Sequence, residues 1–511
     1  MTNYLFDALV GHQDEASAFA TIVPPVEGVK PRYYTYEHVQ SVSARFAHKL
    51  VNLGVEPGDR VAVQVPKSME AVMLYLATVR CGAVFLPLNT AYTRAEVAYF
   101  IGDAAPRLFV CDPARLDEFA DLATDGLALE TMGVWLDEEG GYGSLLVDHG
   151  EAHTFENVPQ GADDLAAILY TSGTTGRSKG AMLSHGNLLS NSQTLVECWR
   201  FTKDDVLLHA LPIFHTHGLF VATNVALLAG CRLIFMVKFE LDTIIQHMPD
   251  GTALMGVPTF YTRLLDDERF TRELAASMRL FVSGSAPLLA ETHRAFEQRT
   301  GQRILERYGM TETNMNTSNP YDGERRAGTV GFPLPGVDLR VMDAETGEAV
   351  PNGEIGVLEV KGPNVFQGYW NMPEKTAEEF RDDGFFITGD LGRVDEDGYV
   401  HIVGRGKDLI IAGGYNIYPK EVETVIDSID GVLESAVIGV PHPDLGEAVV
   451  AVVVLTDKRL KAEDVIEYGA EHLARFKHPR QVFLVNELPR NTMGKVQKNV
   501  LREQYAGLFN R

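Results

Sequence analysis

Short apolar runs alternate with longer amphipathic stretches between residues 165 and 308. A continuous apolar run is typical of a buried strand, and apolar residues with a period of about 3.6 are typical of a helix. Such alternation favours mainly parallel sheets covered by helices. The predicted strands are 60–65, 165–170, 206–211, 254–257 and 279–282, and the predicted helices are 68–79, 186–199, 258–265 and 289–300.

The pattern changes after residue 320. Residues 320–400 are rich in Gly and Pro and contain β-like runs at 356–360 and 400–403, which predict a β-rich subdomain. Beyond a glycine-containing stretch at 404–414, strand-like and helix-like segments alternate again, at 421–429, 434–440, 449–455 and 462–473. A stretch of about a hundred residues suits one small domain.

We therefore predict an α/β fold class with two domains. Residues 1–405 form a large N-terminal domain of parallel-type α/β sheets plus the β-rich subdomain, and residues 406–511 form a small α/β C-terminal domain. The length of 511 residues agrees, because it exceeds what one hydrophobic core usually supports.

Composition excludes some classes of function. The 45 Lys and Arg against 70 Asp and Glu give a net charge of -25, which argues against a sequence-independent nucleic-acid surface. The N-terminus shows no signal peptide, and the densest apolar run, 449–455, is too short to span a bilayer. The four cysteines are scattered without a Cys-x-x-Cys pair: Cys81, Cys111, Cys198 and Cys231. We expect reduced thiols in a cytoplasmic protein, with neither a disulfide framework nor a zinc site.

A loop with the composition of a phosphate cradle follows the predicted strand at 165–170. It reads Tyr-Thr-Ser-Gly-Thr-Thr-Gly-Arg-Ser-Lys-Gly over residues 170–180. Gly173 and Gly176 allow backbone N–H groups to turn inward, the hydroxyls add donors and Lys179 adds charge, which suits a polyphosphate. The Walker A spacing cannot be laid onto it. A flexible surface turn is the alternative, and the position directly after an apolar strand disfavours it.

This loop resembles the phosphate-binding signature of the AMP-forming, adenylate-forming superfamily, which includes the acyl-CoA synthetases. The other motifs of that superfamily follow in order: Tyr-Gly-Met-Thr-Glu-Thr at 308–313, Thr-Gly-Asp at 388–390, Gly-Arg-Gly-Lys-Asp at 404–408 and Pro-Arg-Asn-Thr-Met-Gly-Lys at 489–495. Each motif alone is weak, but the five together extend over nearly the whole chain. The resemblance implies an ATP-dependent, AMP-forming acid:CoA ligase.

In such an enzyme a carboxylate attacks the α-phosphate of ATP, which forms an acyl-adenylate and pyrophosphate, and the acyl group then passes to the thiol of coenzyme A. Charge accumulates in the first step, so cations and donors must be placed beforehand. By resemblance, Glu312 holds Mg²⁺ with Thr171 as a second oxygen ligand. Thr311 hydrogen-bonds the α-phosphate, and Lys495 bridges the attacking carboxylate and the α-phosphoryl oxygens. We expect Lys495, Thr311 and Glu312 to be the catalytic residues.

The resemblance also assigns contacts to the nucleotide and to CoA. Tyr308 packs on adenine, Asp390 binds the ribose hydroxyls, and Arg405 adds donors beside them. Gly413 and Gly414 are expected to line the pantetheine tunnel, since glycines permit close approach of the backbone. The other residues expected beside the nucleotide are Ser172, Gly173, Thr174, Thr175, Gly176, Lys179, Gly284, Ser285, Ala286, Glu306, Arg307 and Met310.

One site must serve adenylation and then thioester formation. The superfamily achieves this by a large rotation of the C-terminal domain, so the resemblance implies that this domain is mobile. Lys407 is the expected hinge, because few residues can absorb such a change in φ and ψ. The resemblance further implies that a lysine acetyltransferase acts on Lys495, which would remove the catalytic charge.

The residues around the acid indicate which substrate is activated. The segment 211–218 resembles the family segment whose first histidine, His215, stands near the substrate carboxylate. Residues 256–263 place Arg263 in the first turns of a helix that, in this fold, borders the acyl pocket. A buried guanidinium without a partner would be costly, so we expect Arg263 to meet a second negative charge on the substrate.

The segments 282–288 and 307–319 resemble those of malonyl-CoA synthetases. In that interpretation Arg263 holds the distal carboxylate of malonate, helped by His215 and Ser285, and methylmalonate is a further candidate. Two alternatives share the catalytic motifs: a short-chain or aryl monocarboxylate:CoA ligase, and a stand-alone adenylation enzyme that loads a carrier protein. The alternative for Arg263 itself is a position on the solvent side of its helix.

Overall fold

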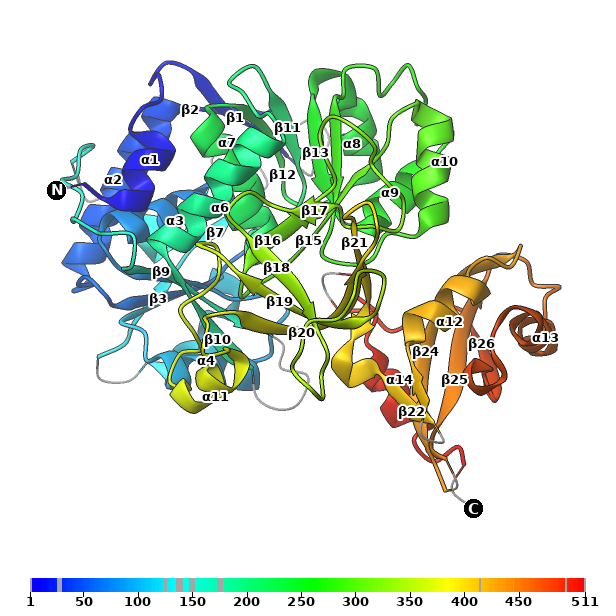
Figure 1. Cartoon of the computed structure of the whole chain (residues 1–511). Coiled ribbons are helices and arrows are strands. Elements are labelled where there is room, and N and C mark those ends of the chain that lie inside the picture. Colours follow the sequence, from blue (N-terminus) through cyan, green and yellow to red (C-terminus); the bar gives the residue numbers. More distant parts are fainter. Residues whose placement is uncertain are drawn as a thin grey trace. The chain divides into compact units, whose positions relative to one another are not determined.

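The chain divides into two compact units in the computed structural model (Figure 1). The N-terminal unit contains residues 1–338 and 361–384, and the C-terminal unit contains residues 339–360 and 385–511. The sequence predicts other bounds, with domains 1–405 and 406–511, and this division stays a prediction. The structure describes residues 2–24, 30–123, 126–134, 141–146, 152–171, 178–412, 415–443, 445–491 and 494–509.

A nine-stranded sheet organises the N-terminal unit. Its strands, in spatial order, are β17 (Phe332–Pro333), β16 (Asn314–Ser318), β15 (Leu305–Met310), β14 (Leu280–Ser283), β13 (Ala253–Gly256), β11 (Val206–His209), β12 (Arg232–Met236), β1 (Ala18–Val23) and β2 (Arg32–Thr35). The neighbours from β15 to β1 run parallel, whereas β16, β17 and β2 are antiparallel to their neighbours. Because parallel neighbours end at the same edge, the carboxyl ends of β13, β14 and β15 lie side by side.

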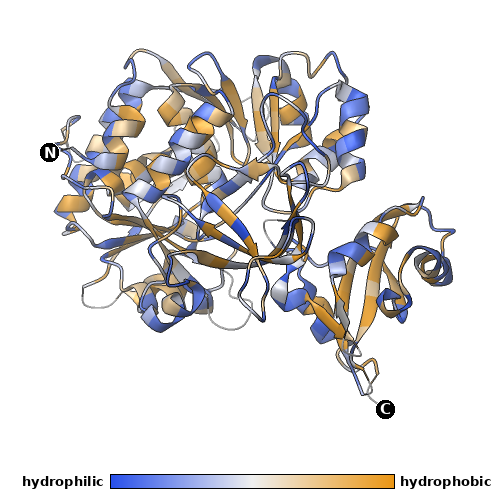
Figure 2. Cartoon of the chain, in the orientation of Figure 1, coloured by the Kyte–Doolittle hydropathy of each residue, from blue (hydrophilic) through white to orange (hydrophobic). Residues whose placement is uncertain are grey.

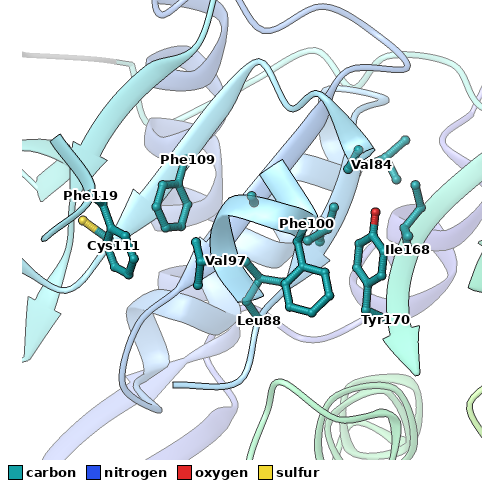
Figure 3. Close-up of a cluster of buried hydrophobic side chains, with 12 residues drawn as sticks. Val84, Leu88, Val97, Phe100, Phe109, Cys111, Phe119, Ile168 and Tyr170 are labelled. Carbon is teal, nitrogen blue, oxygen red and sulfur yellow. The ribbon is translucent and has the colours of Figure 1, made fainter. Parts of the chain in front are cut away.

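The second large sheet of this unit carries the predicted phosphate loop. Its spatial order is β10 (Lys179–Ser184), β9 (Leu165–Thr171), β4 (Val84–Pro87), β3 (Arg60–Gln64), β5 (Leu108–Cys111) and β6 (Ala128–Thr131). Its neighbours are parallel except for β9 and β10, which flank the loop as an antiparallel hairpin. A buried cluster that includes Phe100, Ile168 and Tyr170 packs along β9 towards the loop (Figure 3). β7 (Gly133–Val134) and β8 (Gly141–Tyr142) form a separate pair.

Helices accompany these sheets, as the amphipathic stretches predict. They are α1 (Tyr4–Val10), α2 (Tyr36–Asn52), α3 (Met69–Arg80), α4 (Arg94–Ala104), α5 (Leu116–Phe119), α6 (His185–Cys198), α7 (Asn224–Ala229), α8 (Leu241–His247), α9 (Pro258–Leu265), α10 (Ala290–Thr300) and α11 (Pro373–Glu379). α2 packs on α3, α6 on α7, and α9 on α10. A π-helix, η4 (His217–Thr223), runs directly into α7. Such wide helical turns are rare and often occur at functional sites.

The C-terminal unit contains two further sheets. The first has the order β18 (Asp338–Met342), β19 (Gly356–Lys361), β20 (Phe386–Val394) and β21 (Val400–Arg405). The second has the order β23 (Tyr415–Ile417), β22 (Ile410–Ala412), β25 (Gly446–Leu455) and β24 (Val432–His442), with β26 (Gln481–Val485) also paired to β25. The helices of this unit are α12 (Pro419–Ile426), α13 (Ala462–His472) and α14 (Lys498–Tyr505). β24 and β25 are strongly hydrophobic (Figure 2), because both faces of their sheet are buried. Val437 belongs to one buried cluster, and the next residue of β24, Ile438, belongs to another.

The predicted α/β fold class is confirmed, and every strand and helix predicted between residues 165 and 300 has a counterpart. β10 and β12 have none among the predicted elements, and β10 begins at Lys179, inside the polar loop motif. The four cysteines are free, which agrees with the predicted absence of disulfides. Within the described ranges, helices of sufficient length and apolar character to cross a membrane do not occur.

Candidate active site

The carboxyl ends of β13, β14 and β15 carry much of the candidate site. Gly256 pairs with Ser283, and Ser283 pairs with Glu306, across these parallel strands. The segments that follow β14 and β15 therefore lie at one edge of the sheet, where ligands of open α/β sheets bind. This edge brings together five residues that the sequence predicts beside the nucleotide: Gly284, Ser285, Ala286, Glu306 and Arg307.

Two tyrosines hold the ends of the phosphate loop. The Tyr170 hydroxyl donates to the Asp103 carboxylate at 2.5 Å, and the Tyr99 hydroxyl donates to the Ser178 carbonyl at 2.9 Å. Tyr99 and Asp103 both belong to α4, so one helix holds both ends of the loop. The predicted loop residues Ser172, Gly173, Thr174, Thr175 and Gly176 lie outside the described residues.

The predicted phosphate-binding lysine, Lys179, is paired with a carboxylate. Its Nζ lies 2.9 Å from Oε1 of Glu379, the last residue of α11, and 4.1 Å from the centre of the Tyr369 ring. The Tyr369 hydroxyl lies 2.6 Å from Glu379 Oε2 and 3.1 Å from Glu312 Oε1. Burial first, and then the two carboxylates, raise the pKa of Tyr369 far above its usual value, so the phenol keeps its proton. Tyr369 and Glu379 belong to none of the sequence motifs.

Glu312 lies at the tip of the hairpin between β15 and β16. Gly309 is required beneath the tip, because a Cβ there would lie 1.8 Å from the Asn314 carbonyl oxygen. Glu312 is 6% exposed, and its neighbour Thr311 is half-buried. This turn therefore presents two of the predicted catalytic residues together.

In the part of the chain that the structure describes, no group of three or more His, Cys, Asp or Glu residues is arranged to hold a metal ion. Mg²⁺ between phosphates needs few protein ligands, because phosphate and water oxygens supply the rest. Glu312, a buried carboxylate, and Thr171, whose hydroxyl donates to the Lys179 carbonyl at 3.5 Å, offer the hard oxygens that this ion prefers. The donor set thus fits Mg²⁺. Tyr308 and Met310, which are expected at the nucleotide, are half-buried on β15.

Arg307 is a buried cation with unused donors. It is 3% exposed, and its Nε and Nη2 contact no acceptor among the described residues. Burial lowers the pKa of its guanidinium to about 9, with a smaller opposing effect of Tyr261. Gly284 makes room for this group, since a Cβ at that position would lie 2.4 Å from Arg307 Cζ. An unsatisfied buried group of this kind costs about 1–3 kcal/mol or more, which makes the position a candidate for binding an anion.

Two histidines stand on the same edge. His217 is buried, and burial first and Arg307 next hold its pKa well below the usual value, so it is neutral. Its Nδ1 lies 3.2 Å from Ser285 Oγ, and its backbone N–H donates to His215 Nδ1 at 3.3 Å. Ser285 has a φ of 69°, a left-handed conformation that is strained for a non-glycine residue and concentrates at functional sites. The structure thus joins the predicted His215 and Ser285 through His217, the second histidine of the His-Thr-His run.

Arg263 does not occupy the buried position expected of it. It is exposed on α9, whose buried residues are Phe260, Tyr261 and Leu264. Its guanidinium lies 6.0 Å from the centre of the Phe239 ring, and it has no ion pair within the described part of the chain. The expected burial is wrong, because helical periodicity turns residues 260, 261 and 264 towards the interior and residue 263 away from it. Its role with the acid stays a prediction.

The C-terminal unit carries the predicted ribose site. Asp390 on β20 pairs with Arg405 on β21, and its Oδ1 lies 2.6 Å from Arg405 Nε. Asp390 is 3% exposed, and its backbone N–H contacts the Thr388 hydroxyl at 3.0 Å. Gly389 has a φ of 70°, which a glycine adopts without strain. The antiparallel pairing therefore holds the two predicted ribose contacts together.

Lys495 and Lys407 belong to the same unit. The backbone of Lys495 closes a turn with Asn491, whose N–H donates to the Lys495 carbonyl at 2.9 Å, and the Lys495 side chain is exposed. Lys407 lies in the short turn Gly406–Asp408. Partial burial first, and then the charge of Arg405, lower its pKa to about 8. The predicted pantetheine contacts Gly413 and Gly414 lie outside the described residues.

Two family models match the chain. The model described as AMP-binding enzyme matches residues 11–370, and the model described as AMP-binding enzyme C-terminal domain matches residues 421–495. This chain belongs to the AMP-binding enzyme family. The superfamily predicted from the five motifs is thereby confirmed.

This AMP-binding enzyme is similar to other proteins over most of its length. The ATP-bound crystal structure of MatB from Rhodopseudomonas palustris shares 57% identity, covers 100% of each chain and has a TM-score of 0.96. A benzoate CoA ligase from Burkholderia xenovorans LB400 shares 26% identity over 98% of this chain and 100% of that chain, with a TM-score of 0.86. A malonate–CoA ligase from Arabidopsis thaliana is 35% identical over 488 residues, 89% of this chain and 79% of the relative. The AMP-binding enzyme is therefore an adenylate-forming acid–thiol ligase that uses ATP, with CoA as the co-substrate.

Proposed function

We propose that this AMP-binding enzyme is a malonyl-CoA synthetase. It converts ATP, malonate and CoA into AMP, pyrophosphate and malonyl-CoA through a malonyl-adenylate, and it also accepts methylmalonate. The observation that carries the proposal is the buried guanidinium of Arg307, whose Nε and Nη2 meet no acceptor in the described ranges. The similarity to a malonate–CoA ligase supports it.

The charge on Arg307 discriminates between classes of acid. A monocarboxylate commits its single charge to the reaction with ATP and leaves the guanidinium unpaired. A short dicarboxylate brings a second charge, and a guanidinium matches a carboxylate with paired N–H donors. Pockets for fatty or aryl acids need mainly apolar walls instead. Arg307, His217 and Ser285 give this edge a polar lining, which favours the dicarboxylate over the monocarboxylate alternative.

Other predicted acid contacts assist in this proposal. His215 and Ser285 orient the two carboxylates. Arg263 adds an exposed cation on the helix that follows β13, where it attracts the dianion without paying for burial. The distal carboxylate of malonate is thus assigned first to Arg307 and only second to Arg263.

For the nucleotide, we retain the roles inferred from the motifs. Glu312 and Thr171 hold Mg²⁺, which when bound neutralises charge on the phosphates. Thr311 donates to the α-phosphate, and Asp390 with Arg405 binds the ribose. Arg307, which the motifs predict beside the nucleotide, is assigned to the acid instead. The other predicted residues surround the nucleotide: Ser172, Gly173, Thr174, Thr175, Gly176, Lys179, Gly284, Ser285, Ala286, Glu306, Tyr308 and Met310.

The C-terminal domain, residues 406–511, completes the cycle in this proposal. Lys495 bridges the carboxylate and the α-phosphate during adenylation, and rotation about Lys407 then admits CoA along Gly413 and Gly414. Acetylation of Lys495 by a lysine acetyltransferase would stop the first step by removing its charge. The four free thiols suit a cytoplasmic location.

A panel of acids tests the substrate. Malonate, methylmalonate, succinate, acetate, butyrate and benzoate are compared by CoA-dependent AMP formation. We expect kcat/KM for malonate to exceed that for acetate or butyrate by about 30-fold or more, since a buried charge pair is worth roughly 2–5 kcal/mol. Butyrate or benzoate in first place would refute the malonate assignment. AMP release with a carrier protein but not with CoA would indicate the stand-alone adenylation enzyme.

A further inference from the structure

Four residues of the N-terminal unit connect the phosphate loop to the Glu312 hairpin. Lys179 lies 2.9 Å from Glu379, and the Tyr369 hydroxyl lies between Glu379 and Glu312, at 2.6 and 3.1 Å. The roles proposed above use only Lys179 and Glu312. Tyr369 and Glu379 join these two residues and have no assigned part in the reaction.

The backbone fixes Tyr369 between the two partners. The Phe366 N–H donates to the Glu312 carbonyl at 2.8 Å, and the Trp370 N–H donates to the Gly180 carbonyl at 2.7 Å. Between these bonds, Tyr369 forms an antiparallel bridge with β10. This segment therefore ties the hairpin tip to the strand that begins at Lys179, and the Tyr369 hydroxyl has little freedom to leave the two carboxylates.

The hydroxyl has one proton, and two carboxylates compete for it. While Lys179 neutralises Glu379, that carboxylate is a weakened acceptor, and Glu312 can share the proton of Tyr369. Once Lys179 turns to a polyphosphate, Glu379 loses a cation and attracts the proton more strongly. The bond from Tyr369 to Glu312 Oε1 is then weakened, and this oxygen becomes a better ligand for a divalent cation.

A second lysine limits the cost of this exchange. Lys375 lies 3.1 Å from Oε1 of Glu379, one helical turn away on α11, and 3.0 Å from Glu378. Glu379 therefore keeps one cation when Lys179 departs. Because Lys375 still compensates the half-buried carboxylate of Glu379, Lys179 can move to the polyphosphate at little cost.

We propose that Glu379 is a counter-ion that the polyphosphate of ATP displaces from Lys179, and that Tyr369, as a positioning residue, transmits this displacement to Glu312. The proposal rests on the nucleotide-binding roles of Lys179 and Glu312 proposed above and is independent of which acid is activated. It couples the binding of ATP and of Mg²⁺, so that each ligand strengthens the other.

Equilibrium binding of ATP to the full chain, by isothermal titration without acid or CoA, tests the counter-ion. In EDTA, Glu379→Gln should bind ATP about 3- to 10-fold more tightly than the parent, because Lys179 no longer has a competing carboxylate. Glu379→Asp, which keeps the charge but shortens the side chain, should fall between the two. Glu378→Gln is the matched control, since Glu378 pairs with Lys375 and, among the described residues, not with Lys179, and it should stay at the parent value. Unchanged or weaker binding by Glu379→Gln would refute the counter-ion.

Tyr369→Phe tests the transmission. This variant keeps the pair of Lys179 and Glu379, so its ATP affinity in EDTA should match the parent. The factor by which excess Mg²⁺ tightens ATP binding should shrink by about threefold or more, because Glu312 no longer responds to Lys179. An undiminished magnesium effect in this variant would overturn the role of Tyr369.

Lys179→Gln tests the proposed role of Lys179 in binding ATP separately from the counter-ion role of Glu379. It should weaken ATP binding in EDTA by about tenfold, since a charged contact to phosphate is lost. If it does not, the proposed role of Lys179 itself fails, and the counter-ion fails with it. If it does, while Glu379→Gln has no effect, only the further inference fails. The acid panel is unaffected by either result, so failure of the malonate assignment is recognised separately.

Discussion

Lys179 and Arg307 both carry positive charge in the N-terminal unit, but their surroundings differ. Lys179 has a carboxylate 2.9 Å away, whereas Arg307 is 3% exposed and its Nε and Nη2 meet no acceptor in the described part of the chain. A polyphosphate has enough charge to displace a counter-ion, while a small acid has one carboxylate to spare. An unpaired guanidinium stabilises a bound acid that has this second carboxylate and stays unpaired beside an acid that lacks it. The selectivity for the acid therefore comes from an unsatisfied charge.

The largest effect is expected when the unpaired charge is removed. Arg307→Met should lower kcat/KM for malonate by about 30-fold to several thousand-fold. This corresponds to a loss of roughly 2–5 kcal/mol in transition-state stabilisation. The same change should raise the thermal midpoint of the ligand-free enzyme by a few degrees, because replacement of a buried unpaired charge with an apolar side chain is stabilising. Steady-state kinetics measure kcat/KM for malonate, and calorimetry measures the thermal midpoint.

The control for this variant is Arg303→Met. Arg303 is an exposed residue paired with Glu297 at 2.7 Å, so its removal should change neither malonate kinetics nor the midpoint appreciably. A fall in the midpoint of Arg307→Met together with unchanged malonate kinetics would mean that Arg307 is a structural residue with a partner of its own.

A smaller perturbation moves the guanidinium instead of deleting it. Gly284→Ala places a methyl group where Arg307 Cζ would be 2.4 Å away, so the end of the arginine must shift. Productive binding needs the paired groups within a few tenths of an ångström, and we expect the KM for malonate to rise about tenfold. ATP affinity should fall much less than malonate affinity. Gly102→Ala, at a helical glycine with open space around it, is the control. Equal losses for ATP and malonate would place Arg307 with the nucleotide.

The pH dependence follows from the pKa of Arg307, which burial lowers from the ordinary value of an arginine to about 9. Above pH 9 the free enzyme loses this charge, so the KM for malonate should rise by up to tenfold per pH unit, and Arg307→Met should lack this rise. Stability should change in the opposite direction. Between the two pKa values the unfolded chain binds more protons than the folded chain, so the free energy of unfolding gains from this group as the pH rises. A flat malonate profile to pH 10 in the parent would contradict the assignment.

The smallest effect is expected at Arg263. Because this side chain is exposed, its interaction with a dianion is screened by solvent. Arg263→Met should raise the KM for malonate by about threefold, less than 1 kcal/mol, and should leave stability unchanged. A loss as large as that of Arg307→Met, measured side by side, would reverse the ranking of the two arginines.

Local patterns predict much of this fold. The sequence predicts a helix at 258–265, and α9 occupies Pro258–Leu265, since proline suits a first helical position and the apolar period is clear. The neighbours of each strand could not be predicted, because pairing joins segments far apart in the chain. β10 also escaped prediction, because its first residues carry the polar composition of the loop motif.

The candidate site, like the fold, could be predicted from the sequence only in part. The motifs identify the residues at the carboxyl ends of β14 and β15, but they do not indicate which side chains lack a partner. The burial of Arg307 depends on Gly284 from another strand, and the state of Lys179 depends on Glu379, 200 residues away in the sequence. Arg263 illustrates the opposite error, since its chemistry suggested burial that the helix does not provide.

The segment around Tyr369 has one more consequence. β10 is the last strand of its sheet, and its outer edge is covered by bonds from the Met182 N–H to the Gly368 carbonyl at 2.9 Å and from the Gln367 N–H to the Met182 carbonyl at 3.0 Å. An uncovered edge strand is a template for pairing with another molecule. The same residues that border the phosphate loop therefore protect the protein from edge-to-edge aggregation. A break in the chain here would expose the edge of β10 to other copies.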